Sequence, residues 1–413
     1  MRDRVMPHRV VITGMGVITA TARTVQEFDA SLRAGTSGIK EVTIFDASSF
    51  PFRSMGEIRG FSPLGSLDRA SALALCAAEQ AASDAGSAEV DRRRARTGVV
   101  LGTTCGGVTS HEEQLRRSKG GGELELDALD EIPFHVMSTH VARKFRLGGP
   151  VATVTIACAS GANAVGYASD LIRAGKAELM LAGGSDCVSA FTFSGFSSLR
   201  AMTRDLCQPF DESRTGIVLG EGAAVVVLED AEQAIRRGAT IHAEVLGYGF
   251  CNDAYHSTSP DPRGGGMRKS IQDALDSAGV SASDIDYINA HGTGTTANDA
   301  MELVAYRTLL GERSALVPLS SIKAMVGHTL GAAGAIELVA TVLALQGQYV
   351  PPTLNSRRPP DPAQFDIVPN VSRSASLRYA LCCNAGFAGH NTAVLLGRFD
   401  QSTHAPPLAA AEA

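Results

Sequence analysis

Three hallmarks of other protein classes are missing from the sequence. Its eight cysteines form no C-x-x-C pair and lie mostly among apolar residues, which favours reduced thiols over a disulfide framework. The N-terminal stretch MRDRVMPHRVV contains no secretory hydrophobic region, and no apolar run is expected to reach the length of a membrane span. We therefore expect a cytoplasmic protein that does not associate with membranes.

The sequence also lacks an excess of positive charge. Its formal net charge is -6, which argues against general nucleic-acid binding. The chain has 413 residues, of which 44% are hydrophobic and 19% charged, a composition typical of soluble globular proteins. This length is sufficient for a large core and, by the usual domain size, for two or three domains.

Apolar runs typical of buried strands alternate with helical patterns along nearly the whole chain. Examples in a first series are 97–101 and 151–156, and a second series starts near residue 241. This alternation predicts an α/β fold with a largely parallel sheet. The two series are similar in pattern, so we expect two similar halves packed face to face, 1–240 and 241–400. The tail, 401–413, is predicted to be disordered.

Cys158 stands between the apolar run 151–156 and a stretch of small residues that begins at Ala159. A strand, a sharp turn and a helix would place this thiol at a helix N-terminus, where the unpaired N–H groups and the macrodipole favour the thiolate. A free cysteine is, however, often just a small buried apolar residue. Two later segments each place a histidine at the end of a predicted strand, and a cysteine with convergent histidines is a recurrent arrangement for acyl transfer. Cys158 is therefore a candidate nucleophile.

The first of these histidines, His291, is followed by a run of glycines and threonines. Glycines let the backbone approach a ligand closely, and the hydroxyl groups of Thr293 and Thr295 can bind amide groups of a flexible chain. The pattern Gly-x-Gly-x-x-Ala also resembles a dinucleotide-binding turn. That alternative is disfavoured because no acidic partner is evident about 20 residues later, and because it leaves the histidine unexplained.

The second histidine, His328, lies five residues after Lys323 at a predicted strand-to-helix turn. The apolar helix that follows carries Glu337, and an acid on a buried helix face needs a partner, for which Lys323 is the natural candidate. In isolation, the lysine could equally be a solvated loop residue and His328 a core histidine.

Phe387 belongs to a last glycine-rich turn, 383–392. The backbone amides of this turn either face the thiol or simply close a hairpin.

Taken together, these segments resemble a β-ketoacyl-ACP synthase, specifically the elongating type with a Cys-His-His triad in the thiolase-like superfamily. The resemblance extends from Arg9 to Leu396. Its motifs are, in order, ITGMGVIT, ACASG, PFDESRTGIVLGEGA, NDAYHSTSPDP, NAHGTGT and SSIKAMVGHTLGAAGAIE. The resemblance implies a thiolase-like fold of αβαβα layers with parallel or mixed sheets. It also implies an acyltransferase that condenses malonyl-ACP, with loss of CO2, onto a Cys-bound acyl chain in type II polyketide or fatty-acid biosynthesis.

The same resemblance implies a role for each candidate residue. Cys158 would carry the acyl chain, and His291 and His328 would promote decarboxylation of the malonyl group. Lys323 and Glu337 would together set the electrostatics of the site, and Thr293 and Thr295 would bind the pantetheine arm. Phe387 would act as a gate, and its N–H would form an oxyanion hole with the N–H of Cys158. Cys105 would line the acyl tunnel. No cofactor or metal is implied, since the substrates arrive on the phosphopantetheine arm of ACP; zinc on the triad would lack the usual local ligand spacing.

The last turn departs from the family's pattern. Many relatives read N-S-F-G-F-G-G-T-N where this chain reads C-N-A-G-F-A-G-H-N, from Cys383 to Asn391. Ala385 replaces a bulky residue and would open space beside the thiol, whereas Ala388 replaces a glycine and would stiffen the gate. We therefore hypothesise that the acyl intermediate is not a plain saturated chain but, for example, an unsaturated or polyketide one.

Two other functions compete with this interpretation. A catalytically inactive, chain-length-factor-like subunit is disfavoured because Cys158 and both histidines are present. A degradative thiolase would carry a second catalytic cysteine near the last turn, where Cys382 and Cys383 lie, but the paired histidine segments fit a decarboxylating synthase better.

The resemblance also implies partners. The superfamily is usually dimeric, with the acyl tunnel completed across the interface, so we expect a homodimer or a heterodimer with a chain-length-factor-like subunit. Acyl-ACP and malonyl-ACP are the expected substrates. Carrier proteins are typically acidic, which predicts a basic patch near the entrance, with Arg200 as one candidate.

Overall fold

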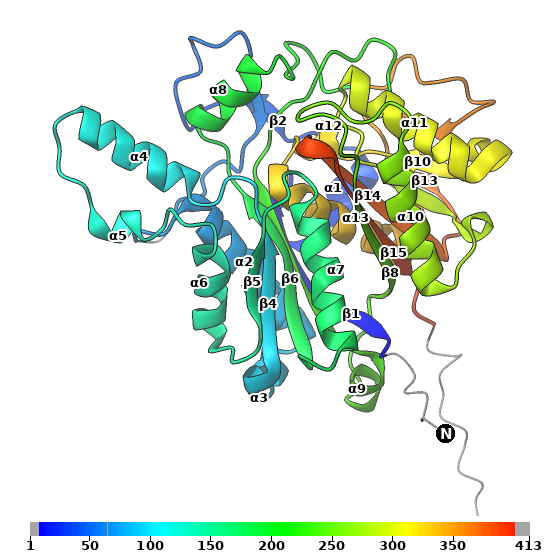
Figure 1. Cartoon of the computed structure of the whole chain (residues 1–413), viewed down its shortest axis with the longest axis horizontal. Coiled ribbons are helices and arrows are strands. Elements are labelled where there is room, and N and C mark those ends of the chain that lie inside the picture. The colour runs from blue at the N-terminus through cyan, green and yellow to red at the C-terminus, as the bar shows by residue number, and fades with distance from the viewer. Residues whose placement is uncertain (1–7, 64, 401–413) are drawn as a thin grey trace, which may run out of the picture.

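The computed structural model describes residues 8–63 and 65–400, so the predicted disordered tail, 401–413, lies outside the described residues. Figure 1 shows one large twisted sheet surrounded by helices. The strands of this sheet are β1 (Val10–Thr19), β4 (Thr97–Gly102), β5 (Val151–Val154), β6 (Leu179–Asp186), β7 (Gly222–Asp230), β8 (Ala243–Asn252), β9 (Tyr287–Asn289), β10 (Pro318–Ser320), β12 (Asp366–Ile367), β14 (Tyr379–Gly386) and β15 (His390–Gly397). Two short strand pairs lie outside it: β2 (Ile39–Glu41) with β3 (Ser54–Gly56), and β11 (Tyr349–Val350) with β13 (Arg373–Ser374).

The strand order repeats. The sheet runs β12-β10-β9-β14-β15-β8-β1-β7-β6-β4-β5, so the orders β5-β4-β6-β7-β1 and β10-β9-β14-β15-β8 describe two halves with the same topology. In each half the first three strands are parallel to one another. The fourth strand runs antiparallel to both of its neighbours, the third and the fifth. The prediction of two similar βα halves with parallel or mixed sheets is confirmed, and the sheet is mixed. The apolar runs alone indicated a largely parallel sheet, because buried strands of either direction can have the same apolar pattern. The division of the chain at residue 240 stays a prediction.

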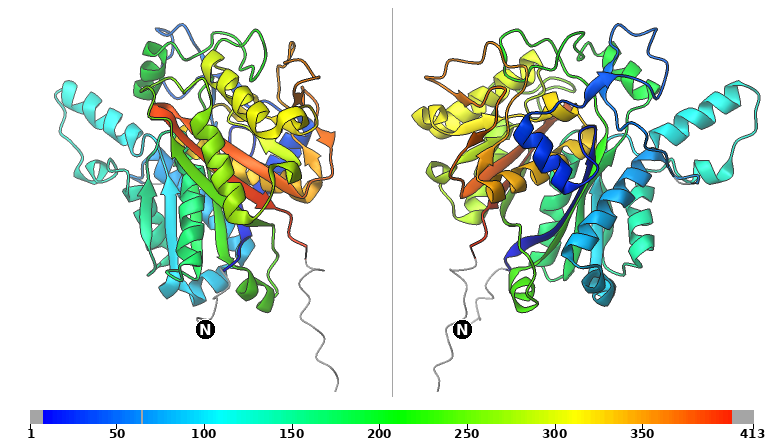
Figure 2. Two further views of the ribbon diagram at one scale, coloured as in Figure 1. Left: turned by 45° about the vertical axis from the view of Figure 1, so that its right-hand side comes forward. Right: turned by 180° about the vertical axis from the view of Figure 1, so that it is seen from behind.

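The helices form three layers around the two halves of the sheet. Their bounds are α1 (Val25–Ala34), α2 (Arg69–Ala85), α3 (Ser87–Arg92), α4 (Val108–Lys119), α5 (Leu126–Leu129), α6 (Val136–Phe145), α7 (Ser160–Arg173), α8 (Ala190–Ser198), α9 (Ala231–Arg236), α10 (Gly265–Ala278), α11 (Thr296–Leu310), α12 (Lys323–Val326) and α13 (Ala333–Gly347). α2 packs on β1, β6 and β7, and α10 packs on β8 and β15. α7 and α13 contact strands of both halves, so they form the central layer (Figure 2). This is the expected αβαβα order.

The central helix α13 is mostly apolar around its whole circumference, with Glu337 as its one charged residue. Together with the turn before it, Leu330–Gly347, it is the one segment of the described residues that is long and apolar enough to cross a membrane, with a mean hydropathy of 1.6. The expectation that no apolar run reaches this length is therefore wrong. An all-apolar helix belongs in a membrane or in a core. Because 89% of the segment is buried inside the protein between the two halves of the sheet, it is a core helix.

The first motif of the chain, ITGMGVIT, is explained by packing. A Cβ atom on Gly14 would lie 2.2 Å from the carbonyl oxygen of Ala81, and one on Gly16 would lie 2.0 Å from that of Ala77. Both carbonyls belong to α2, whose buried side is lined with alanines. The glycines therefore allow β1 and α2 to approach more closely than side chains would permit.

Candidate active site

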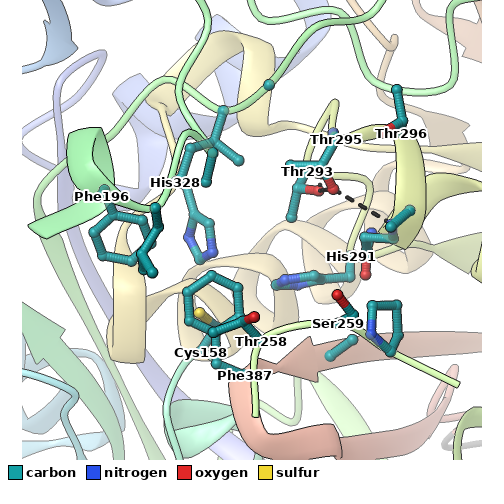
Figure 3. Close-up of a pocket in the computed structure, with 18 of the residues that line it drawn as sticks. Cys158, Phe196, Thr258, Ser259, His291, Thr293, Thr295, Thr296, His328 and Phe387 are labelled. Atoms are coloured by element: carbon teal, nitrogen blue, oxygen red, sulfur yellow. Dashed lines mark hydrogen bonds between the residues drawn. The ribbon is translucent and has the colours of Figure 1, made fainter. Parts of the chain in front are cut away.

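One cavity brings the predicted nucleophile and both predicted histidines together (Figure 3). It has a volume of about 240 Å³ and lies where the C-terminal end of β5 meets the turns after β9 and β10. The sulfur of Cys158 and one nitrogen of each histidine lie within 4.8 Å of one another. The rings of His291 and His328 meet edge to face, with centroids 5.3 Å apart. Three segments far apart in sequence thus converge on one point.

Cys158 lies in the predicted sharp turn, two residues before α7. Ala157 has a φ of 53°, a left-handed conformation that costs a residue with a Cβ atom roughly 1–2 kcal/mol. Ser160 stabilises the turn, because its hydroxyl donates to the carbonyl oxygen of Ala157 (2.6 Å) and accepts from the N–H of Ile156 (2.9 Å). The strained turn holds the thiol at the cavity.

The two imidazoles have fixed hydrogen-bonding roles. Nδ1 of His328 accepts from the backbone N–H of Leu330 (3.2 Å), and Nδ1 of His291 lies 3.1 Å from Nζ of Lys323, an obligatory donor. Nε2 of each neutral ring therefore carries the hydrogen. Burial and the charge of Lys323 hold the pKa of both histidines well below the usual value, so both rings are neutral. The cavity thus contains two neutral N–H donors whose rings point toward Cys158 (Figure 3).

Lys323 and Glu337 form the predicted buried pair. Lys323 is 1% and Glu337 2% exposed, and Nζ of Lys323 contacts Oε1 of Glu337 and the carbonyl oxygen of His291. Burial raises the pKa of Glu337, and the nearby Lys323 opposes this rise. The pair does not line the cavity but contacts His291 on the side away from the thiol. Removing either partner would leave an uncompensated buried charge.

Comparison with known proteins identifies the family. The model of the beta-ketoacyl synthase N-terminal domain matches residues 8–234, and that of the C-terminal domain matches residues 242–357. This chain belongs to the beta-ketoacyl synthase family. The synthase is 38% identical, over 408 residues, to 3-oxoacyl-[acyl-carrier-protein] synthase 2 of Coxiella burnetii, an alignment that covers 94% of this chain and 98% of the relative. The predicted recognition is confirmed, and the protein is an acyltransferase.

Two solved structures are also similar to the synthase. The ishigamide ketosynthase/chain length factor has a TM-score of 0.91 and 38% identity, and the match covers 96% of this chain and 100% of that one. A type II PKS ketosynthase, bound to the hexaketide and in complex with its acyl-carrier protein, has a TM-score of 0.90 and 34% identity, with 95% and 100% covered. The predicted thiolase-like fold is thereby confirmed.

The protonation state of Cys158 differs from the expectation. The thiol is 5% exposed, and burial raises its pKa to about 12, with Lys323 acting in the opposite direction. A helix terminus stabilises a charge by up to about 2 kcal/mol, equivalent to roughly 1.5 pKa units. Desolvation of a buried group can shift a pKa by about 3–5 units. Burial therefore outweighs the helix terminus, and the resting synthase holds a thiol rather than a thiolate.

A zinc ion does not fit the triad. Zinc would need a lone pair on the cavity-facing nitrogen of each histidine, at about 2.0–2.1 Å from the metal. In His291 and His328 that nitrogen carries the hydrogen, because Nδ1 already accepts from a donor. The proximity of the three side chains is better explained by hydrogen bonding to a substrate.

Of the remaining predicted residues, three line the cavity and one does not. Thr293, Thr295 and Phe387 line the cavity, and the two threonine hydroxyl oxygens lie 2.9 Å apart. Thr295 also caps the N-terminus of α11. Cys105 does not line the cavity; it is half-buried, with its sulfur 3.9 Å from the hydroxyl of Thr192. Its assignment to the acyl tunnel stays a prediction.

Two residues of the site were missed by sequence reasoning. Phe196 stacks on Phe387, with ring centroids 5.8 Å apart, and lines the same cavity (Figure 3). No local pattern distinguishes Phe196 from an ordinary helical aromatic residue. Asn384 is fully buried and contacts Glu337. Its only signal in the sequence is that relatives carry serine at this place in the last turn.

The last turn shows the effect of both alanine replacements. Ala385 is buried and lines the cavity. Ala388 has a φ of 61°, so its methyl group places roughly 1–2 kcal/mol of strain on a conformation that glycine adopts freely. The turn is held by two hydrogen bonds, from the N–H of Ala388 to Ser257 (2.8 Å) and from the amide of Asn252 to the carbonyl of Ala388 (2.9 Å).

Proposed function

We propose that this synthase condenses malonyl-ACP, with loss of CO2, with an acyl chain held on Cys158. The observation that carries the proposal is the convergence of two neutral Nε2–H donors on a thiol inside one cavity. Two such donors are suited to bind a thioester oxygen as negative charge develops on it.

In the first half-reaction, the sulfur of Cys158 attacks the acyl thioester carbonyl. A new C–S bond forms, the bond to the pantetheine sulfur breaks, and the thiol proton passes to that departing sulfur. We assign the oxyanion hole to the N–H groups of Cys158 and Phe387. In support, a Cβ atom on Gly386, the residue before Phe387, would lie only 3.2 Å from the nitrogen of Cys158.

In the second half-reaction, the C–C bond to the malonyl carboxylate breaks and CO2 leaves. The electron pair moves into an enolate whose oxygen accepts hydrogen bonds from His291 and His328. The enolate carbon then attacks the acyl carbonyl carbon, and the bond from that carbon to the sulfur of Cys158 breaks. The sulfur leaves as a thiolate and takes up a proton from water. We assign Thr293 and Thr295 to the pantetheine arm, because both line the cavity.

Replacing His291 or His328 by alanine tests this function. We expect each change to lower CO2 release from malonyl-ACP by roughly 10²–10³-fold, the usual cost of removing one oxyanion donor. Acylation of Cys158 does not need these donors, so the acyl adduct should accumulate and be detected by intact-protein mass spectrometry. Unchanged decarboxylation in both variants, or failure of any acyl-ACP to acylate Cys158, would refute the proposal.

The alternative functions are less consistent with the site. An inactive partner subunit has no need for a complete triad in one cavity. A thiolase needs a second cysteine at the reacting atoms, but Cys382 and Cys383 are fully buried and do not line the cavity. The thiol of Cys382 instead contacts the carbonyl oxygen of Gly334 (3.7 Å).

We propose that the synthase needs no metal and no cofactor beyond the arm carried by its substrates. We also place it in the cytoplasm. The support for this location is that all eight cysteines lie in the described part of the chain and none forms a disulfide.

The acyl carrier protein and a second subunit are the proposed partners. Arg200 is exposed and lines the cavity, so it can contact an acidic carrier at the entrance.

The side of the molecule around β5 is the proposed place of the second subunit. β5 is an edge strand of the sheet, and Val151 on it is 47% exposed. α4 and α5 extend away from the body, and Leu126 on α5 is 76% exposed (Figure 1). We propose that a second copy or a chain-length-factor-like subunit covers this side of the molecule; the similar ishigamide structure contains a chain length factor.

The acyl chain is proposed to be unsaturated or a polyketide, because Ala385 leaves space beside Cys158. In Ala385→Phe, which restores the bulk found in relatives, we expect kcat/KM for such donors to fall about tenfold with little change for short saturated donors. The variant and the wild type should be compared by elongation assays with defined acyl-ACPs, after circular dichroism has shown that the variant folds. An equal loss for all donors, or a wild-type enzyme that shows no preference between donors, would refute this substrate class.

A further inference from the structure

A buried amide behind the active site has no role in the function proposed so far. Asn384 lies on β14, is 0% exposed and does not line the cavity. Its Nδ2 donates to Oε2 of Glu337 (2.5 Å) and lies 3.5 Å from Nδ1 of His291. A fully buried amide with these two contacts, outside the cavity, needs its own explanation.

The contacts form a chain of residues from β14, α13, α12 and the loop after β9. Asn384 on β14 binds one oxygen of Glu337 on α13, and Lys323 on α12 binds the other. Nζ of Lys323 in turn contacts the carbonyl oxygen of His291 and lies 3.1 Å from its Nδ1. Both oxygens of Glu337 are thus occupied, so the carboxylate cannot rotate without breaking a buried hydrogen bond.

The position of Lys323 decides which nitrogen of His291 carries the hydrogen. While Nζ donates to Nδ1, the hydrogen stays on Nε2 and is available to the substrate. Without that contact, the ring can place its hydrogen on Nδ1 and turn Nε2 into an acceptor. Such a ring cannot donate to an enolate oxygen.

We propose that Asn384 is a positioning residue for decarboxylation: by holding Glu337, it keeps Lys323 against Nδ1 of His291 and so keeps the ring's hydrogen on Nε2. This inference rests on the proposed function and extends it. An amide is suited to this place because it stays neutral and donates two N–H groups, whereas serine has a single hydroxyl donor. An ionised side chain here would change the charge balance between Lys323 and Glu337.

The test is Asn384→Leu, which keeps the branched shape of the side chain at a somewhat larger volume and removes its hydrogen bonds. Thr392→Val is the matched control, because Thr392 lies opposite Asn384 on β15, is fully buried, and its hydroxyl has no partner. Both variants are assayed as full-length enzyme for acylation of Cys158 and, separately, for CO2 release from malonyl-ACP. In N384L we expect CO2 release to fall about ten- to a hundredfold with acylation nearly unchanged. T392V should retain both rates.

Nitrogen NMR of enzyme labelled with ¹⁵N-histidine supplies a second measurement that loss of packing would not change. The chain has ten histidines, and the signals of His291 are identified by their absence in His291→Ala. We expect hydrogen on Nε2 alone in the wild type and a mixture of tautomers in N384L. A wild-type tautomer in N384L, or an equal fall in both half-reactions, would overturn the inference. If H291A itself decarboxylated normally, the proposed function would fail instead.

Discussion

Cys158→Ala is expected to abolish chain elongation, with a loss of about 10³-fold or more, while CO2 release from malonyl-ACP stays within about tenfold of the wild type. The two activities separate because the acyl chain requires the sulfur, whereas the enolate is held by the neutral rings of His291 and His328. The change removes one buried sulfur atom from a cavity wall and leaves both imidazoles with their Nδ1 partners. Mass spectrometry for the acyl adduct and radiolabelled CO2 release measure the two steps independently.

Cys76→Ala is the control for this experiment. Cys76 is half-buried on α2 and lies outside the cavity, so its loss should alter neither step. An acyl adduct that persists in C158A would place the nucleophile elsewhere. A C158A enzyme that releases no CO2 would show that the thiol is needed for decarboxylation as well, which contradicts the division of roles.

Lys323→Met is expected to lower the free energy of unfolding by about 3–5 kcal/mol, because it leaves the carboxylate of Glu337 buried without a cation. Decarboxylation should fall as well, since Nδ1 of His291 then keeps only its longer contact, 3.5 Å, with the amide of Asn384. The double variant K323M/E337Q should recover most of the stability, because both charges are gone, but it should not recover decarboxylation. Denaturant unfolding of the two single variants and the double variant gives the coupling between them.

The stability loss in K323M should depend on pH. Burial already raises the pKa of Glu337, and losing Lys323 raises it further. A carboxyl group with a raised pKa binds more protons in the folded state than in the unfolded state, so stability falls as pH rises. The deficit of K323M should therefore be larger at pH 8 than at pH 5.5. A deficit that did not change with pH would mean that Glu337 is already protonated beside Lys323.

Much of the site could be predicted from sequence because its chemistry is local. Cys158 lies in a turn defined by the strand before it and the small residues after it. His291 follows β9 closely, whereas His328 comes after the short helix α12. In contrast, the thiolate predicted for Cys158 was wrong. The helix terminus is visible in the sequence, but the burial that outweighs it comes from segments far along the chain.

Other errors have the same cause. The apolar runs alone did not reveal the antiparallel strands of each half, since a buried strand can have the same apolar pattern whichever direction its neighbour runs. Phe196 could not be identified as a neighbour of Phe387, because the two residues are 191 positions apart and meet only after folding.

The sequence by itself determined the family, the two-half α/β architecture and the candidates for the reacting residues, because short motifs and apolar patterns carry that information. Only the tertiary structure decided the protonation of the site. Whether Cys158 is a thiol, and which nitrogen of His291 carries hydrogen, depends on burial and on partners from β14, α12 and α13. These groups affect one another through short contacts in a low-dielectric interior, which the order of residues along the chain does not specify.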